Sequence, residues 1–248
     1  SSNPSKLLKA RRNIKIKLIE DYNKESDLNK IAIIPVRNLS NNYTNLAFKK
    51  IRGVNLLDKA INDVSKTNLF DYIVLESDDQ KVCNYVDENY PNIITIKREE
   101  NLCGDLVSLS KIVYSAIIEL EKIYNIEFDI IGILPIHCPF RETEDIMECF
   151  NTLILQNMDQ VISTYQDFDM HFLHSSLGMK PINPNTIDSI RYEREALYVN
   201  NGAVHFTKRE WIDKFSMYKG KIGHFVMEKS RSIQLKTKED LNNFNNEI

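Results

Sequence analysis

The stretch KIAIIPV, from Lys30 to Val36, decides the fold class of this 248-residue chain. A short, continuous apolar run of this kind is typical of a strand buried on both faces of a parallel sheet, and we expect the first strand over 31–36. A helical spacing of apolar residues follows over 55–67, and a second apolar run ends in two acids over 70–79. Strand, helix and strand in this order indicate a βαβ unit.

The same alternation continues to residue 166. Further strands are expected at 92–98, 128–136 and 159–166, and further helices at 80–90, 106–124 and 143–156. We therefore predict a Rossmann-like α/β fold over 30–248, with a mostly parallel sheet flanked by helices. Residues 1–29 form a polar N-terminal extension in this interpretation.

The pattern changes after Gln166. We interpret 167–200, which looks irregular, as a small insertion from the same sheet that serves dimerisation. Residues 196–212 are read as strand, turn, strand and helix, and 231–241 as a strand that runs into a helix capped by Thr237.

Composition excludes several classes of protein. The net charge is −3 and the pI is near 6.0, so a broad nucleic-acid surface is not expected. No apolar run approaches the roughly 20 residues of a membrane span, and no secretory signal is seen. The four cysteines form no C-x-x-C pair, so we expect reduced thiols and a cytoplasmic location.

The loop after the first strand is well placed to hold phosphates. Arg37 offers a guanidinium fork there, although the loop has no glycine before Gly53 and so matches neither a P-loop nor a dinucleotide fingerprint. Arg37 either binds an anion or holds loop carbonyls. Asp78 and Asp79, at the end of the second strand, either take part in ligand binding or are solvated turn acids.

Six segments together resemble the cytidylyltransferases that activate sialic acids and related ulosonic acids. They occur in the family's order, as IAIIPVRNLS, LFDYIVLESDD, KREENLCGDLVSLS, ILPIHCPFRETEDI, ALYVNNGAVHFTKRE and KIGHFVMEKSRSIQLKTKEDL. The resemblance covers about 30–248. It implies a fold of the nucleotide-diphospho-sugar transferase type, a homodimer, and synthesis of a CMP-activated ulosonic or nonulosonic acid from CTP.

The resemblance also implies which residues bind the reactants. Those matching nucleotide-binding positions are Arg37, Ser40, Arg98, Asp105 and Ser108. Those on the sugar-acid side are His137, Arg141, Arg191, Tyr198 and Asn201. His137 either donates a hydrogen bond to the sugar acid or is a packing histidine. Arg191 either binds the sugar acid across a dimer interface or forms an interface salt bridge.

Three departures from the family fall on chemical positions, and one puts Pro135 where the family has a glutamine that the resemblance implies contacts the sugar acid. In the phosphate loop, the family's two glycines and its lysine are replaced by Asn38, Leu39 and Asn41. The family's two magnesium-binding aspartates correspond to Gln234 and Lys236. Because Mg²⁺ prefers carboxylate and phosphate oxygens, we expect no metal site and no cofactor, with Mg²⁺ only if the family mechanism survives.

Two functions stay open. One is an active cytidylyltransferase. The other is a catalytically inactive or repurposed relative that binds a nucleotide, a nucleotide sugar or a partner protein without Mg²⁺, with Lys236 as a fixed cation in the repurposed case.

Overall fold

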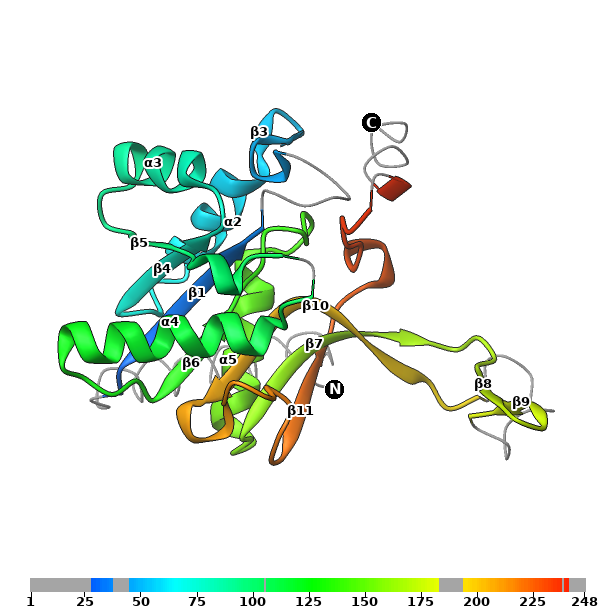
Figure 1. Ribbon diagram of the computed structural model, residues 1–248. Coiled ribbons are helices and arrows are strands. Elements are labelled where there is room, and N and C mark those ends of the chain that lie inside the picture. The colour runs from blue at the N-terminus through cyan, green and yellow to red at the C-terminus, as the bar shows by residue number, and fades with distance from the viewer. Residues whose placement is uncertain (1–27, 38–44, 105, 183–193, 238, 241–248) are drawn as a thin grey trace, which may run out of the picture.

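The computed structural model describes residues 28–37, 45–104, 106–182, 194–237 and 239–240 (Figure 1). Several predicted positions lie outside this part of the chain: most of the N-terminal extension, the loop positions 38–41 with Ser40, and also Asp105 and Arg191.

In the described part of the chain, the main sheet has seven strands in the order β11-β7-β10-β6-β1-β4-β5. Their bounds are β1 Lys30–Val36, β4 Tyr72–Ser77, β5 Ile94–Lys97, β6 Ile130–Ile133, β7 Gln160–Asp167, β10 Leu197–Lys208 and β11 Ile222–Val226. Strand β10 is antiparallel to both of its neighbours, and the other pairs are parallel. The predicted mostly parallel sheet is confirmed.

Strand β1 supplies side chains to two apolar cores on opposite faces of the sheet. Ile31 and Ile33 pack in one core, whereas Ala32 and Ile34 pack in the other. The helices that cover the sheet are α2 Leu56–Ser65, α3 Gln80–Asn89, α4 Leu109–Tyr124 and α5 Thr143–Leu155. Helix α4 lies on the first face, and the other three contribute to the second core (Figure 1). Burial on both faces is why β1 is apolar at nearly every position.

Polar side chains fix where three of these helices begin. Asn55 accepts a hydrogen bond from the backbone N–H of Asp58 at the start of α2, and Asp79 accepts one from Lys81 at the start of α3. Ser108 caps α4 in the same way. Such caps satisfy N–H groups that have no partner inside the helix.

The insertion is more regular than predicted. Strands β8 (Phe172–Ser175) and β9 (Gly178–Pro181) form an antiparallel hairpin at the end of an arm that projects from the sheet (Figure 1). Strand β10 extends into this arm as one long strand, so the predicted turn inside it is wrong. A register shift between Asn200 and His205 takes the place of the turn, with Gly202 at φ 64°. The helix expected after β10 is a short 3₁₀ turn, Arg209–Trp211.

The strand expected within 231–236 is not formed. A 3₁₀ turn covers Lys229–Arg231, and 232–236 has no strand assignment. The backbone N–H of Leu235 donates to the carbonyl of His137 at 2.8 Å. Leu235 is buried but Ile233 is 37% exposed, so the alternation does not mark a two-sided strand. The predicted cap is present, because Thr237 and Asp240 exchange side-chain-to-backbone hydrogen bonds of 2.7 and 3.1 Å.

Two further observations concern the cysteines and the helices. Cys83, Cys103, Cys138 and Cys149 are all free thiols, as expected. Among the described residues, no helix combines the length and the apolar character that crossing a bilayer requires.

Candidate functional site

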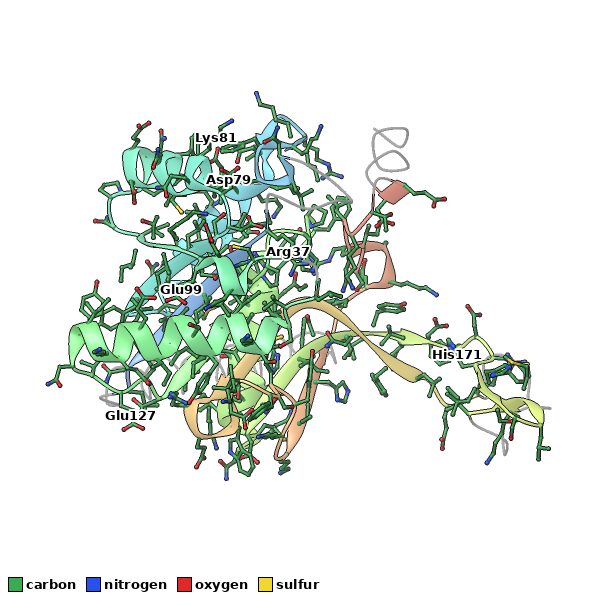
Figure 2. All side chains as sticks on the ribbon, in the orientation of Figure 1. Arg37, Asp79, Lys81, Glu99, Glu127 and His171 are labelled. Atoms are coloured by element: carbon green, nitrogen blue, oxygen red, sulfur yellow. The ribbon has the colours of Figure 1, made fainter. Side chains whose placement is uncertain are left out.

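The candidate site lies at the carboxyl edge of β1, β4 and β6, where open α/β sheets bind ligands. Arg37 follows β1 at this edge, and Asp79 follows β4 (Figure 2). Asp78 and Asp79 are 4% and 7% exposed, so their interpretation as solvated turn acids is wrong. They are buried because Asp79 caps α3 and its N–H donates to Ser77 Oγ at 3.1 Å.

The structure brings Arg37 next to the beginning of α4. Its Nη2 atom lies 3.5 Å from the carbonyl oxygen of Val107, the residue before the helix cap Ser108. Ser108 is exposed, and its hydroxyl accepts from the N–H of Lys111 and lies 3.0 Å from Ser110 Oγ. A helix N-terminus favours negative charge, so Arg37 and α4 together suit a phosphate group.

Arg98, predicted to bind the nucleotide, points its guanidinium at a residue of the protein. Its Nε and Nη2 atoms bind the two carboxylate oxygens of Glu76 at 2.7 and 2.6 Å, and both side chains are buried. Burial raises the pKa of Glu76, and the bonds to Arg98 oppose that rise. Nη1 of Arg98 has no hydrogen-bond partner among the described residues, and it is the only part of the fork left for a ligand.

His137 lies in the loop after β6 and is half-buried. Burial lowers its pKa to about 4, and the positive charges of Lys236 and Arg141 lower it further. The imidazole is therefore neutral at pH 7, with one N–H to donate.

Gly202 allows Gln234 and His137 to approach the bulge of β10. A Cβ atom at Gly202 would lie 2.9 Å from Gln234 Nε2 and 3.7 Å from His137 Nε2. The amide of Gln234 donates to the carbonyl oxygen of Asn201. His137, Gln234 and the bulge thus form one wall of the candidate site.

Three other residues on the sugar-acid side differ in how accessible they are. Arg141 is 1% exposed, and its Nη1 donates to the carbonyls of Pro135 and Ala203, both at 2.9 Å. Asn201 is also buried, with its amide donating to Ser232 Oγ at 2.9 Å. Tyr198 is 50% exposed and is the most accessible of the three.

Sequence reasoning missed two of these partners. Glu76 lies within β4, just before Asp78 and Asp79, and its position in the strand gave no sign of a partner. Ser232 lies in a segment that was predicted to be a strand. Their partners are 22 and 31 residues away, at Arg98 and Asn201, and no local pattern in the sequence indicates either pair.

The residues at the expected metal position do not fit Mg²⁺. No group of three or more His, Cys, Asp or Glu side chains in the described ranges could hold a metal ion. Gln234 uses its amide nitrogen inside the protein, and Lys236 carries a positive charge that repels a divalent cation.

Comparisons with known proteins support the resemblance seen in the sequence. No family model matches. The chain is 21% identical over 216 residues to the post-translational flagellin modification protein B of Campylobacter coli, covering 85% of this chain and 91% of that protein. It is 22% identical over 217 residues to a pseudaminic acid cytidylyltransferase of Campylobacter jejuni, covering 85% and 92%.

Solved structures confirm the fold. A 4-diphosphocytidyl-2C-methyl-D-erythritol synthase from Anaerococcus prevotii superposes with a TM-score of 0.63 at 14% identity, covering 90% of this chain and 99% of that one. A CMP:2-keto-3-deoxy-manno-octonic acid synthetase, solved with CTP, gives 0.63 at 11% identity, covering 87% and 96%.

Proposed function

We propose that this chain, a divergent relative of the ulosonic-acid cytidylyltransferases, makes a CMP-activated ulosonic or nonulosonic acid from CTP. The observation that carries the proposal is the position of Arg37 beside the N-terminus of α4, at the carboxyl edge of a parallel sheet. The similarity to pseudaminic acid cytidylyltransferase extends over 85% of the chain and makes an acid of that type the first substrate to test.

In the proposed reaction, a hydroxyl of the sugar acid attacks the α-phosphate of CTP. One phosphorus–oxygen bond forms, another breaks, and pyrophosphate leaves. Arg37 and the N–H groups at the start of α4 neutralise phosphate charge, which grows on the leaving group. The neutral imidazole of His137 and the hydroxyl of Tyr198 position the sugar acid.

Lys236 has a special part in this proposal. It follows Leu235, whose backbone N–H donates to the carbonyl of His137, and its positive charge lowers the pKa of His137. We assign it the role of a fixed cation that pairs with a phosphate or carboxylate of the reactants. Because the residues here do not fit Mg²⁺, no step of the proposal depends on a metal at positions 234 and 236.

A second function is favoured by the same two residues. The amide of Gln234 is bonded to the Asn201 carbonyl, and Lys236 cannot align two reactants as a divalent ion does. A repurposed or inactive relative keeps the nucleotide edge and binds a nucleotide or nucleotide sugar without catalysis. In both cases we propose a cytoplasmic homodimer.

Release of pyrophosphate from CTP tests the first function. We expect release with pseudaminic acid above the level without any acid, and little or none with N-acetylneuraminic acid. If no sugar acid supports release while CTP still binds in calorimetry, the second function is correct. If CTP, CMP and a CMP-sugar all fail to bind, both are wrong.

A further inference from the structure

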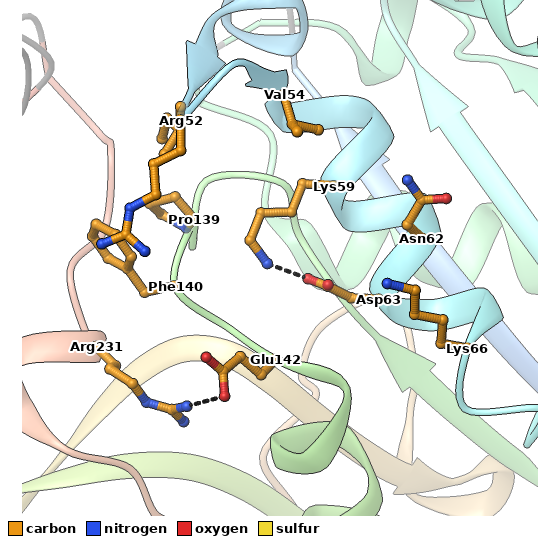
Figure 3. A pocket seen from close by; sticks show the side chains of 11 residues that line it. Arg52, Val54, Lys59, Asn62, Asp63, Lys66, Pro139, Phe140, Glu142 and Arg231 are labelled. Atoms are coloured by element: carbon orange, nitrogen blue, oxygen red, sulfur yellow. Dashed lines mark hydrogen bonds and ion pairs between the residues drawn. The ribbon is translucent and has the colours of Figure 1, made fainter.

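A pocket lies between α2, the hairpin of β2 (Lys50–Ile51) and β3 (Val54–Asn55), and the start of α5 (Figure 3). Its volume is about 380 Å³, within the range of small-molecule sites. Its described lining contains none of the residues assigned above to nucleotide or sugar acid.

Positive charge exceeds negative charge in this pocket. Four cations, Arg52, Lys59, Lys66 and Arg231, line it together with two carboxylates, Asp63 and Glu142. Both carboxylates are already paired, because Lys59 Nζ lies 2.7 Å from Asp63 and Arg231 Nη1 lies 2.7 Å from Glu142 (Figure 3).

The two other cations are available to a ligand. Arg52 and Lys66 form no ion pair with any residue in the described part of the chain, and both are exposed. Arg52 comes from the hairpin and Lys66 from the end of α2, so the two charges border the pocket from different elements (Figure 3). An occupant therefore meets an excess of two positive charges.

The rest of the lining is largely apolar. Ile51 and Val54 come from the hairpin, and Pro139 and Phe140 come from the loop after β6. Arg52, Pro139 and Phe140 all line the pocket (Figure 3). A flat or apolar group fits against this wall while a charged group reaches the cations.

We propose that the pocket binds a phosphate monoester with an apolar or aromatic body. A phosphate monoester carries a charge of about −1.5 to −2 at pH 7, which matches the two unpaired cations. A carboxylate carries only one charge, and inorganic phosphate has no body to cover the apolar wall. The pocket is thus a second anion site beside the proposed nucleotide edge.

Calorimetry with phenyl phosphate tests the proposal. We expect saturable binding to the full chain, weaker binding of benzoate and of inorganic phosphate, and about tenfold weaker phenyl phosphate binding by Arg52→Gln/Lys66→Gln. The matched control Lys81→Gln/Lys122→Gln removes the same charge from exposed positions on α3 and α4, and we expect it to bind as the unmodified protein does.

A variant of the nucleotide edge separates the two sites. We expect Arg37→Ala to leave phenyl phosphate binding unchanged. The proposal is overturned if phenyl phosphate does not bind, if benzoate binds equally well, or if the control double variant weakens binding as much as Arg52→Gln/Lys66→Gln. Loss of binding in Arg37→Ala also overturns it, because the ligand is then at the nucleotide edge.

Discussion

Gln234 and Lys236 are two residues apart in an unpaired segment that is tied to the site through Leu235 and the carbonyl of His137. The ammonium of Lys236 and a divalent cation repel each other, and removal of water strengthens that repulsion. The pKa of His137 is lowered first by burial and then by the positive charges of Lys236 and Arg141. We propose that the chemistry at this position depends on a fixed charge.

Restoring the two carboxylates tests this interpretation. We expect Gln234→Asp/Lys236→Asp to bind Mg²⁺ measurably by calorimetry, because two carboxylates replace an amide and a cation. Full cytidylyl transfer is not expected to follow, since Asn38, Leu39 and Asn41 still replace the two glycines and the lysine of the family's phosphate loop. The control Gln156→Asp/Lys221→Asp makes the same charge change at exposed positions. Equal Mg²⁺ binding by this control would show that net charge alone causes the effect.

The proposal that this edge of the sheet binds the nucleotide depends on Arg37. We expect Arg37→Ala to weaken CTP binding by about 1.5–3 kcal/mol, the range for a hydrogen bond to a charged group. Titration calorimetry measures the change, and Lys81→Ala on α3 is the control because Lys81 is exposed. An unchanged dissociation constant in Arg37→Ala would falsify the assignment of this edge.

The protonation of His205 should make the free energy of unfolding depend on pH. Its ring is buried, Nε2 lies 3.0 Å from Gln160 Oε1, and burial lowers its pKa to about 4. The unfolded chain binds a proton near the ordinary value of 6.5 while the folded chain does not, so stability is lost as the pH falls from 6.5 towards 4. We expect His205 to account for a loss of about 2 kcal/mol between pH 7 and pH 5.

Urea unfolding at pH 7 and pH 5 measures this loss. His205→Gln removes the titrating group, so its free energy of unfolding should change less between the two pH values. His174→Gln, at an exposed position on β8, serves as the control. An identical pH dependence in His205→Gln and the unmodified protein contradicts the prediction.

At the scale of elements, the periodicity of apolar residues predicted the strands that are buried on both faces and the helices that bury one face against the sheet. Strand β1 is apolar at nearly every position because both of its faces are covered, and the spacing in α2 and α4 reflects one buried face. The segment 231–236 shows the limit of this reasoning. Alternation predicts which side chains share a face, but whether a neighbouring strand is available to pair is a property of the tertiary structure.

The orientation of long side chains could not be predicted for a similar reason. The sequence placed Arg37, Ser108 and His137 at one edge of the sheet, and the structure brings them there. It did not indicate that Arg98 binds buried Glu76 or that Arg141 binds two carbonyls, because those partners are distant in the chain. Arginine is as suited to such internal bonds as to a ligand.

At the scale of the whole molecule, the projecting arm presents apolar side chains to solvent. Leu173, Leu177 and Met179 of the hairpin are 58%, 98% and 62% exposed. An apolar surface on a projecting hairpin fits the predicted homodimer, since such surfaces are usually covered by a partner. The proposed partner is a second copy of this chain.

Light scattering at micromolar concentration tests the homodimer. We expect twice the mass of one chain for the unmodified protein and the mass of one chain for Leu173→Asp/Met179→Asp, because two charges would be buried in the interface. Glu119→Lys/Glu127→Lys, at exposed positions on α4 and just after it, should stay dimeric. A single-chain mass for the unmodified protein contradicts the proposal.

The central claim is that this edge of the sheet binds a cytidine nucleotide through fixed charges and not through Mg²⁺. Titration calorimetry of CTP into the unmodified protein, once with Mg²⁺ and once with EDTA, tests it most directly. We predict saturable binding with the same dissociation constant in both buffers. Binding that requires Mg²⁺, or no binding in either buffer, would contradict the claim.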